Sequence, residues 1–373
     1  MDKTFEHRRR LQTPPDIIRS ADSIRFPFWT QSAALARIAK SNASVVARVA
    51  SRIPRTRNAR VNDHLMDIAA VVPTPQDARR LLTQATYYAK HPYHLSAAIF
   101  GDIIEHWVSI GAVDAGLRLA QEILKFRRGY RPKVPRKEKR SRLLSGMSPE
   151  PEPRIPAWEF KQIVEGGIRK LSEADPQRTL ALLLGAIESY LRLSRRGPDD
   201  YSDVWCQNVA SASSFHEGIG VVVSAAVACF ASSTTNRRRF RKADALVRSH
   251  ESLIFDRIRW NVYARSPKTA RSTIANDLFT YIPRFSTTLY PVEFADMIRR
   301  SVHALKKNLL PTSRWRRLWS ILSKDPVIKR LVNWLGHPLT QGRLNHVSHV
   351  CDRPDSPLSN LYCPRASREN YKL

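Results

Sequence analysis

The chain has 373 residues, enough for two domains or for one extended array of repeats. Hydrophobic residues make up 42%, so a sizeable core can be buried, and 24 Pro against 13 Gly favour short helices punctuated by proline over a glycine-turned sheet protein. Lysine and arginine total 62 against 33 acidic residues, a net charge of +29 that predicts attraction to polyanions such as nucleic acid or an anionic membrane surface. The charge alone specifies no site, because an arginine-favouring genome would produce the same surplus.

Cysteine usage and the apolar runs bear on the compartment. The four cysteines are too sparse for a disulfide scaffold and form no CxxC pair, which fits a reducing cytoplasm. The amino terminus lacks the apolar core of a secretory signal. The longest apolar run, residues 218–231, is shorter than the roughly 20 residues of a membrane span, so we interpret it as a buried core helix. We expect a cytoplasmic protein without a membrane segment.

The first part of the chain shows apolar residues at helical spacing over residues 30–51, 62–72, 76–90, 94–111 and 113–126. Asn62 or Asp63 is a candidate N-cap for the second of these helices, which Pro73 ends. Pro75 stands where a first-turn proline is tolerated before the next helix. Short turns between helices of this length predict antiparallel neighbours, as in an α-solenoid.

Residues 125–156 break the helical pattern with prolines and with ten basic residues between Lys125 and Arg142, which predicts a solvated linker. Helical periodicity returns at Trp158 and continues to about residue 335, whereas no periodicity follows Gly336. We therefore predict an all-α protein, an α-solenoid of antiparallel helix pairs forming a TPR- or HEAT-like superhelix. Its expected parts are an N-terminal segment (1–24), a first helical array (25–126), a basic, proline-rich linker (127–156), a second helical array (157–336) and a disordered tail (337–373).

Searches for catalytic patterns find none complete. The glycines of GAVDAGLR, residues 111–118, have phosphate-loop spacing but lack the lysine and hydroxyl residue that follow, so we interpret them as a turn between helices. No HExxH or GxSxG sequence occurs. Histidines and cysteines of the tail lack the paired spacing of a zinc site, and His91 and His94 read as surface histidines at a turn. We predict no catalytic residue, no cofactor and no bound metal.

Two basic clusters are the candidate binding residues. Arginine and lysine at this density can neutralise phosphates and release counterions, while Tyr130 and Phe240 could stack on bases. A solvated loop in a basic protein is the competing interpretation. The candidate nucleic-acid-binding residues are Arg127, Arg128, Arg131, Lys133, Arg136, Lys137, Lys139, Arg140, Arg237, Arg238, Arg239 and Arg241.

Several segments taken together carry a family resemblance. They are Phe28-Trp29 followed by ALARIA, Ile53-Pro54 with Thr56, Asn58 and Arg60-Val61 leading into HLMDIAAVVP, WVSIGAVDAGLRLAQEIL, Asp200–Trp205, and SLIFDRIRWNVYARSP. In this order the set, covering residues 25–335, resembles the helical arrays that follow the nucleotide-binding domain in large bacterial STAND-type NTPases, many of which are implicated in antiphage defence or signalling.

Departures from that pattern limit what the resemblance implies. Arg57 stands where the family tends to carry an acidic residue, Cys206-Gln207 stand where it has Arg-Pro, and no phosphate loop precedes the array. ATPase activity is therefore not implied. The resemblance implies a stand-alone or truncated piece of such a protein, acting as a non-catalytic interaction scaffold or sensor array for an unidentified protein partner. The alternative is a non-specific nucleic-acid-binding protein that uses the basic clusters.

Overall fold

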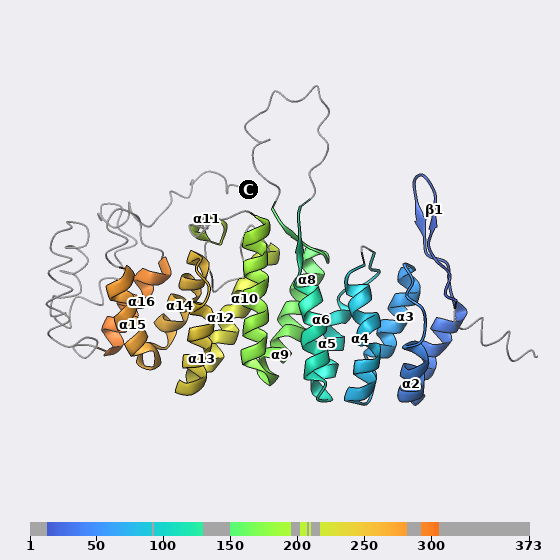
Figure 1. Ribbon diagram of the computed structural model, residues 1–373, viewed down its shortest axis with the longest axis horizontal. Helices are drawn as coiled ribbons and strands as arrows, with labels where there is room; N and C mark the ends of the chain where they lie inside the picture. Colours follow the sequence, from blue (N-terminus) through green and yellow to red (C-terminus); the bar gives the residue numbers. More distant parts are fainter. Residues whose placement is uncertain are drawn as a thin grey trace, which may run out of the picture. The chain divides into compact units, whose positions relative to one another are not determined.

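The computed structural model describes residues 13–91, 93–129, 150–194, 202–206, 209, 217–281 and 292–305 (Figure 1). The predicted tail (337–373), most of the predicted linker and the helical pattern beyond residue 305 lie outside the described residues. Within them the chain is mostly helical, which confirms the all-α prediction. The principal helices are α2 (Thr30–Ala50), α3 (Ala59–Ala69), α4 (Pro75–Ala89), α5 (Ile99–Ser109), α6 (Val113–Ile123), α8 (Ala157–Ile163), η2 (Val164–Ile168), α9 (Arg169–Ala174), α10 (Pro176–Leu193), α12 (Glu217–Ser232), α13 (Arg237–Arg248), α14 (Leu253–Arg265), α15 (Pro267–Tyr281) and α16 (Val292–Leu305).

The remaining described elements are short. Two antiparallel ladders of two-residue strands occur, one joining β1 (Ile18–Arg19) to β2 (Ile24–Arg25) and the other joining β3 (Phe126–Arg127) to β4 (Glu152–Pro153). The short helices are α11 (Ser202–Trp205) and the 3₁₀ turn η3 (Ser233–Thr235). The chain divides into two compact units. The first contains every described element up to Ile274 together with α16.

Local sequence signals account for several helix ends. At α4 the Thr74 side chain accepts a hydrogen bond from the Asp77 amide, and Pro75 occupies the first helical position, as predicted. Asp175 and Pro176 repeat the same device at α10. The N-cap prediction for α3 was wrong, because Asn58 caps this helix by accepting from the Arg60 amide. The helix therefore starts at Ala59, one turn earlier than Asn62 suggested.

The turn before α3 is a structural corner that holds the amino-terminal segment. The buried Asn58 side chain donates to the carbonyl oxygens of Pro15 (3.2 Å) and Pro27 (2.7 Å), and Thr56 Oγ1 also donates to Pro15 (3.3 Å). Arg57 pairs with Asp16 at 2.8 Å on the surface. The polar residues of this turn are thus engaged with backbone and with an acid of the same chain.

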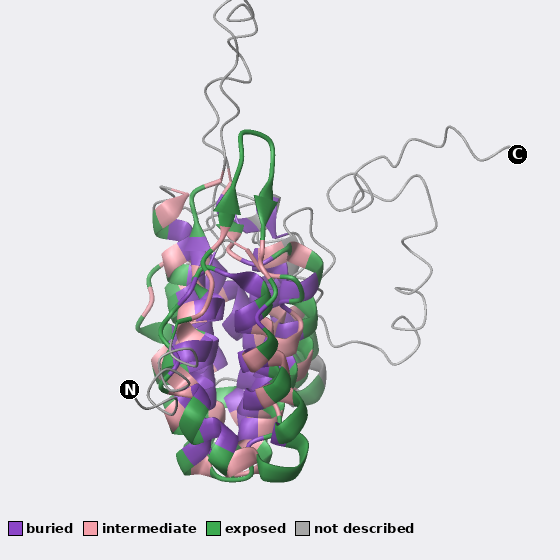
Figure 2. Cartoon of the chain, turned by 90° about the vertical axis from the view of Figure 1, so that its right-hand side faces the viewer, coloured by how far each residue is buried: buried purple, intermediate pink, exposed green. Residues whose placement is uncertain are grey.

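The helices of the first unit lie in two rows, and each contacts the next member of its own row. One row contains α3, α5, the continuous helix α8–η2–α9, α12, α14 and α16. The other contains α2, α4, α6, α10 and α13. Contacts such as α2 with α3, α5 with α6 and α10 with α12 join the rows. Figure 2 shows the buried residues on the sides where helices face one another.

The helices before and after residues 127–156 pack against each other in this unit. Helix α5 packs on α8, η2 and α9, and Gly167 of η2 approaches Gly101 of α5 so closely that an added Cβ would lie 2.8 Å from the Gly101 carbonyl oxygen. Phe126 pairs with Pro153 in the β3–β4 ladder, so the two ends of the intervening segment are held together. The two predicted arrays thus share one packed core.

The core contains both apolar helices and buried charge. Helix α12 carries the long apolar run; by length and composition the stretch Gly218–Thr235 could cross a membrane, but 56% of it is buried inside the fold, as in the core helix of a soluble protein. In α14 the buried Arg257 donates two hydrogen bonds to the buried Glu293 of α16, at 2.8 and 2.7 Å. Arg259, also buried, pairs with Asp256 at 2.6 Å.

Candidate interaction surface

The amino end of α13 carries the best-defined of the predicted basic residues. Asn236 caps the helix by accepting from the amides of Arg238 and Arg239, which lets the arginine run begin directly after a turn. The side chains of Arg237, Arg238, Arg239 and Arg241 are exposed, and within the described part of the chain none of the four forms an ion pair. This group, with Lys242, is called the α13 cluster below.

The prediction that Phe240 could stack on bases was wrong, because this residue is buried. Its side chain is only 2% exposed and its ring is stacked on Phe230 at a centroid distance of 5.7 Å. The reason is helical geometry, because Phe240, Ala243, Asp244 and Val247 share the inward face of α13. The aromatic residue belongs to the core, and only its basic neighbours reach solvent. Tyr130, the other predicted stacking residue, lies outside the described residues.

The position of the α13 cluster opposes the helix dipole. Cations near a helix amino terminus are unfavourable, by about 0.3–1 kcal/mol each for exposed side chains at low salt. Like charges on adjacent turns add further repulsion. No carboxylate of the described residues offsets these terms by pairing with Arg237, Arg238, Arg239 or Arg241. The cluster therefore costs stability in the free protein and favours a bound anion.

The other predicted cluster lies at a different place. Arg127 belongs to β3 and approaches Glu152 of β4 at 3.6 Å, and Arg128 is exposed. The remaining residues of this cluster lie outside the described residues, namely Arg131, Lys133, Arg136, Lys137, Lys139 and Arg140.

Helix α10 shows how far apart the two clusters are. Phe126, next to Arg127, contacts Tyr190 near the end of α10, with ring centroids 5.3 Å apart. At the start of α10, the Pro176 carbonyl accepts a hydrogen bond from the Cys229 thiol at 3.2 Å. Cys229 shortly precedes the α13 cluster in the chain, so this cluster lies near the start of α10. Since α10 has 18 residues, its two ends lie about 27 Å apart at 1.5 Å per residue. The structure therefore does not bring Arg127 and Arg128 together with the α13 cluster.

A half-buried group of titratable side chains surrounds Tyr88. The Tyr88 hydroxyl donates to Asp63 at 2.5 Å, and His94 Nε2 donates to the Tyr88 carbonyl at 2.9 Å. Burial, with a smaller contribution from nearby Asp67 and Glu159, raises the pKa of Asp63 to about 6 although the Tyr88 hydrogen bond lowers it. Burial also raises the pKa of Tyr88. Tyr88 is fully buried and its hydroxyl and carbonyl both have partners, so we interpret the group as a satisfied polar part of the core.

The interpretation of His91 and His94 as surface histidines was wrong, because His91 is buried and His94 is partly buried. His91 is only 6% exposed and accepts from the Tyr93 amide at 3.2 Å, while the His94 ring packs against Tyr88 at a centroid distance of 4.9 Å. Burial lowers the pKa of both imidazoles. Both histidines therefore serve to anchor the turn between α4 and α5.

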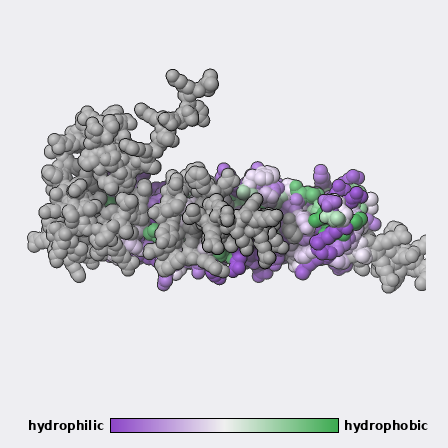
Figure 3. Space-filling model, turned by 90° about the horizontal axis from the view of Figure 1, so that it is seen from above, coloured by the Kyte–Doolittle hydropathy of each residue, from purple (hydrophilic) through white to green (hydrophobic). Residues whose placement is uncertain are grey.

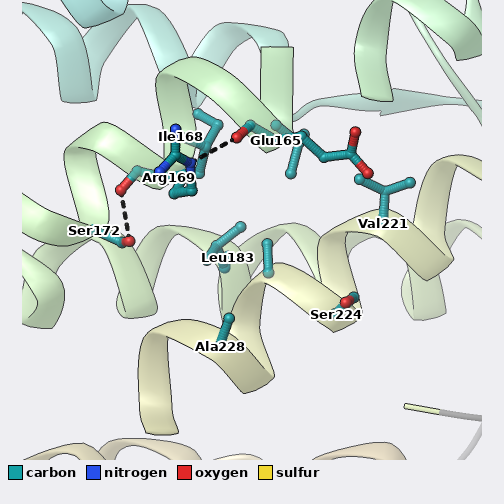
Figure 4. A pocket seen from close by; sticks show the side chains of 10 residues that line it. Glu165, Ile168, Arg169, Ser172, Leu183, Val221, Ser224 and Ala228 are labelled. Atoms are coloured by element: carbon teal, nitrogen blue, oxygen red, sulfur yellow. Dashed lines mark hydrogen bonds between the residues drawn. The ribbon is translucent and has the colours of Figure 1, made fainter. Parts of the chain in front are cut away.

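A cavity of about 300 Å³ lies between η2, α9, α10 and α12 (Figure 4). Its walls are mainly apolar, with Ile168, Leu183 and Val221 among them. The polar residues at its rim are engaged locally, since Arg169 Nε donates to the Glu165 carbonyl at 3.1 Å and Ser172 Oγ donates to the Arg169 carbonyl at 2.7 Å. Arg169 and Ser172 are thus engaged within their own helical segment.

Two of the four cysteines lie among the described residues. Cys206 and Cys229 are buried and form no disulfide among the described residues, and burial raises the pKa of the Cys229 thiol to about 12, which makes it a poor nucleophile. Among the described residues no group of three or more His, Cys, Asp or Glu side chains could hold a metal ion.

Comparison with known proteins found no match among family models, curated proteins or solved structures. The chain's own residues and geometry therefore carry the functional inference.

Proposed function

We propose that this protein is an α-solenoid that acts as a non-catalytic interaction scaffold or sensor array for a protein partner. The support for the solenoid is the regular pattern of contacts, in which each helix packs on its neighbour in the chain and on the next helix of its row. Such an arrangement buries the inner faces and leaves long outer surfaces for a partner. The resemblance to the helical arrays of STAND-type NTPases supports a role in bacterial defence or signalling. A cytoplasmic location remains part of the proposal.

The observation that carries the proposal is the exposed apolar side of α2, the first helix of its row among the described residues, which is kinked at Asn42. Ile38 before the kink and Val45 and Val49 after it are exposed to 48%, 59% and 38%. Helical arrays need terminal helices with polar outer faces to remain soluble, and α2, at the end of the described row, departs from this rule. We infer that a helix of a protein partner packs on α2 and continues the row, as α4 does on its other side. Figure 3 shows hydrophobic residues among hydrophilic ones at the end of the described surface that contains α2 and the β1–β2 hairpin.

Photo-crosslinking tests this proposal. A photoreactive amino acid replaces Val45 in the full chain, and in a matched control it replaces Gln121, an exposed polar residue of α6. We expect a discrete crosslinked species with the Val45 probe only, in an extract of the native cells. Excess unlabelled protein should suppress it, whereas excess Ile38→Glu/Val45→Glu/Val49→Glu protein should not. Equal crosslinking at both positions, or suppression by the triple variant, would contradict the proposal. A crosslink to a second copy would identify the partner as the chain itself.

Non-specific binding of nucleic acid is a second candidate function. The observation in its favour is the α13 cluster, whose arginines are exposed and carry no ion pair in the described part of the chain. On this candidate, replacing Arg237, Arg238, Arg239 and Arg241 with glutamine weakens binding of a fluorescent duplex and reduces its salt dependence. Binding that is unchanged in this variant would refute a role for the cluster.

A further inference from the structure

The α13 cluster has basic neighbours along the same edge of the first unit. Arg178 near the start of α10 pairs with Asp114 near the start of α6 at 2.5 Å, so these two helices begin at one edge. Helix α12 ends beside the start of α10, because the Cys229 thiol donates to the Pro176 carbonyl, and α13 follows after a short turn. Thr269 Oγ1 in the first turn of α15 donates to the Thr234 carbonyl at 3.3 Å, which brings the start of α15 beside the start of α13.

Helix α4 contributes to this edge as well. The pKa of Asp114 is lowered chiefly by the hydrogen bond from Arg178, and also by Coulombic attraction to Arg178, Arg79 and Arg118. Arg79 lies in the second turn of α4 and Arg118 in the second turn of α6, and α4 packs on α6, so both arginines lie on the same side as the pair of Arg178 with Asp114. Arg178 also pairs with Asp175 at 2.5 Å, so two carboxylates lie beside this arginine. Ion pairs between exposed groups are weak and screened by salt, and Arg79 and Arg118 keep their own positive potential because they form no ion pair with a described residue.

The exposed cations of the edge form a band that is called the basic ridge. Outside the α13 cluster, Arg79, Arg118, Lys268 and Arg271 form no ion pair with a described residue, and they are exposed. The ridge consists of Arg79 on α4, Arg118 on α6, Arg178 on α10, Arg238, Arg241 and Lys242 on α13, and Lys268 and Arg271 on α15.

We propose that the basic ridge binds the sugar–phosphate backbone of duplex nucleic acid along its length. This inference rests on the second candidate function and extends it from one helix to five. Cations in a row repel one another until a polyanion binds, and binding then releases its condensed counterions. Neighbouring packed helices lie about 8–10 Å apart, so four steps from α4 to α15 span roughly 35 Å, close to one turn of duplex.

The residues between the cations favour a duplex over a single strand. Single-stranded nucleic acid is usually held by aromatic side chains on which bases stack. Phe240, the aromatic residue of α13, is buried, and the large exposed hydrophobic residues of the described chain lie on other elements. Among the described residues the ridge therefore offers cations for phosphates and none of the large exposed hydrophobic side chains for base stacking, so we expect little sequence preference.

The experiment compares three variants that each lose four positive charges. The α13 variant carries Arg237→Gln, Arg238→Gln, Arg239→Gln and Arg241→Gln. The flank variant carries Arg79→Gln, Arg118→Gln, Lys268→Gln and Arg271→Gln. The control variant carries Arg25→Gln, Arg37→Gln, Lys40→Gln and Arg48→Gln, which are exposed cations of β2 and α2. Circular dichroism and thermal melting verify that all three remain folded.

Fluorescence anisotropy with a labelled 24-base-pair duplex, measured over a salt series, gives the affinity and its salt slope. Each phosphate contact contributes about −0.9 to the log–log slope. We therefore expect the flank variant, which loses four ridge cations, to reduce the magnitude of the slope by roughly 3.6, and the α13 variant, which loses the two ridge cations Arg238 and Arg241, to reduce it by roughly 1.8. The control variant should keep the wild-type slope. A single strand of the same length should bind more weakly.

Each other result overturns the inference in a distinguishable way. Loss in the α13 variant alone would confine binding to α13 and leave the second candidate function standing. Equal loss in all three variants would indicate diffuse charge without a ridge. Competition by polyglutamate as effective as that by duplex would identify an acidic protein as the partner. Absence of any duplex binding would reject both nucleic-acid proposals, and it would leave the scaffold to the crosslinking experiment.

Discussion

Replacing Gly167 with alanine tests the close contact between η2 and α5. A Cβ at this position would lie 2.8 Å from the Gly101 carbonyl oxygen, 3.0 Å from Ile104 Cβ and 3.2 Å from Gly101 Cα. Carbon atoms normally pack at about 3.5–4.0 Å, so the two helices must move apart. None of the three atoms is the tip of a flexible side chain, so rotation of a side chain cannot relieve the overlap. Overpacking of this kind costs about 1–3 kcal/mol.

The adjacent Gly166 provides a matched control in the same turn. A Cβ added at Gly166 meets nothing within 4 Å. Alanine there removes the entropic cost of a helical glycine and should stabilise the protein by about 0.5–1 kcal/mol. Alanine at Gly167 gains the same helix propensity, which offsets only part of the overpacking. We therefore expect neighbouring substitutions of identical chemistry to change the free energy of unfolding in opposite directions.

Urea unfolding monitored by circular dichroism measures the difference. The transition midpoint should fall for Gly167→Ala and rise slightly for Gly166→Ala, with the slope of the transition unchanged. A Gly167→Ala protein as stable as Gly166→Ala would show that α5 and η2 are not packed as closely as the structure indicates. The reasoning from close packing would then be wrong.

Three further substitutions test other parts of the fold. Asn58→Ala removes an N-cap and two hydrogen bonds to the amino-terminal segment, so we expect the free energy of unfolding in urea to fall by about 2–4 kcal/mol. Trypsin should also cleave faster within residues 19–25, and unchanged cleavage would contradict the anchoring role. Glu293→Ala leaves Arg257 without its buried carboxylate and should cost about 3–5 kcal/mol, whereas the double variant Arg257→Met/Glu293→Leu should recover most of this loss in thermal melting. Asp63 has a pKa of about 6 when folded against 3.8 ordinarily, so the folded state holds this proton more tightly and stability should rise as the pH falls from 7 toward 4. Asp63→Asn, which keeps an acceptor for Tyr88, should flatten that rise, and an unchanged pH profile of unfolding would refute it.

Helix positions were predictable because their signals are local. The proline that starts α4, Pro75, reads directly from the sequence. The predicted end of the preceding helix at Pro73 was wrong, because α3 already ends at Ala69. Of residues 111–118, interpreted as a turn between helices, only the start lies in the turn, because α6 begins at Val113. Gly111 has a φ of 81°, which suits a residue without a side chain. The apolar run of α12 is a largely buried helix, as its composition indicates. Helical periodicity and turn preferences depend on residues a few positions apart, so they can be recognised in the sequence alone.

Burial of individual polar and basic residues was not predictable in the same way. In the sequence, Arg257 and Arg259 look like surface arginines of a basic chain, yet both are buried. Each pairs with a carboxylate on another helix, Arg257 with Glu293 of α16 and Arg259 with Asp244 of α13. His91 and His94 similarly depend on contacts with Tyr88 and Tyr93. Partners of this kind stand up to dozens of positions away in the chain, and their placement follows from packing.

For the candidate binding surface, too, the sequence indicated some of the residues and only the packing of the helices revealed the others. Charge density along the chain was sufficient to single out Arg237, Arg238, Arg239 and Arg241, and helical spacing could also have assigned Phe240 to the inward face. The sequence shows no cluster at Arg79, Arg118, Arg178 or Lys268, because these residues are separated by dozens of positions. Only the packing of successive helices, each beginning at the same edge, brings them beside α13. Local composition determines which side chains are charged, and tertiary structure determines which charges act together, because electrostatic potential depends on distance in space.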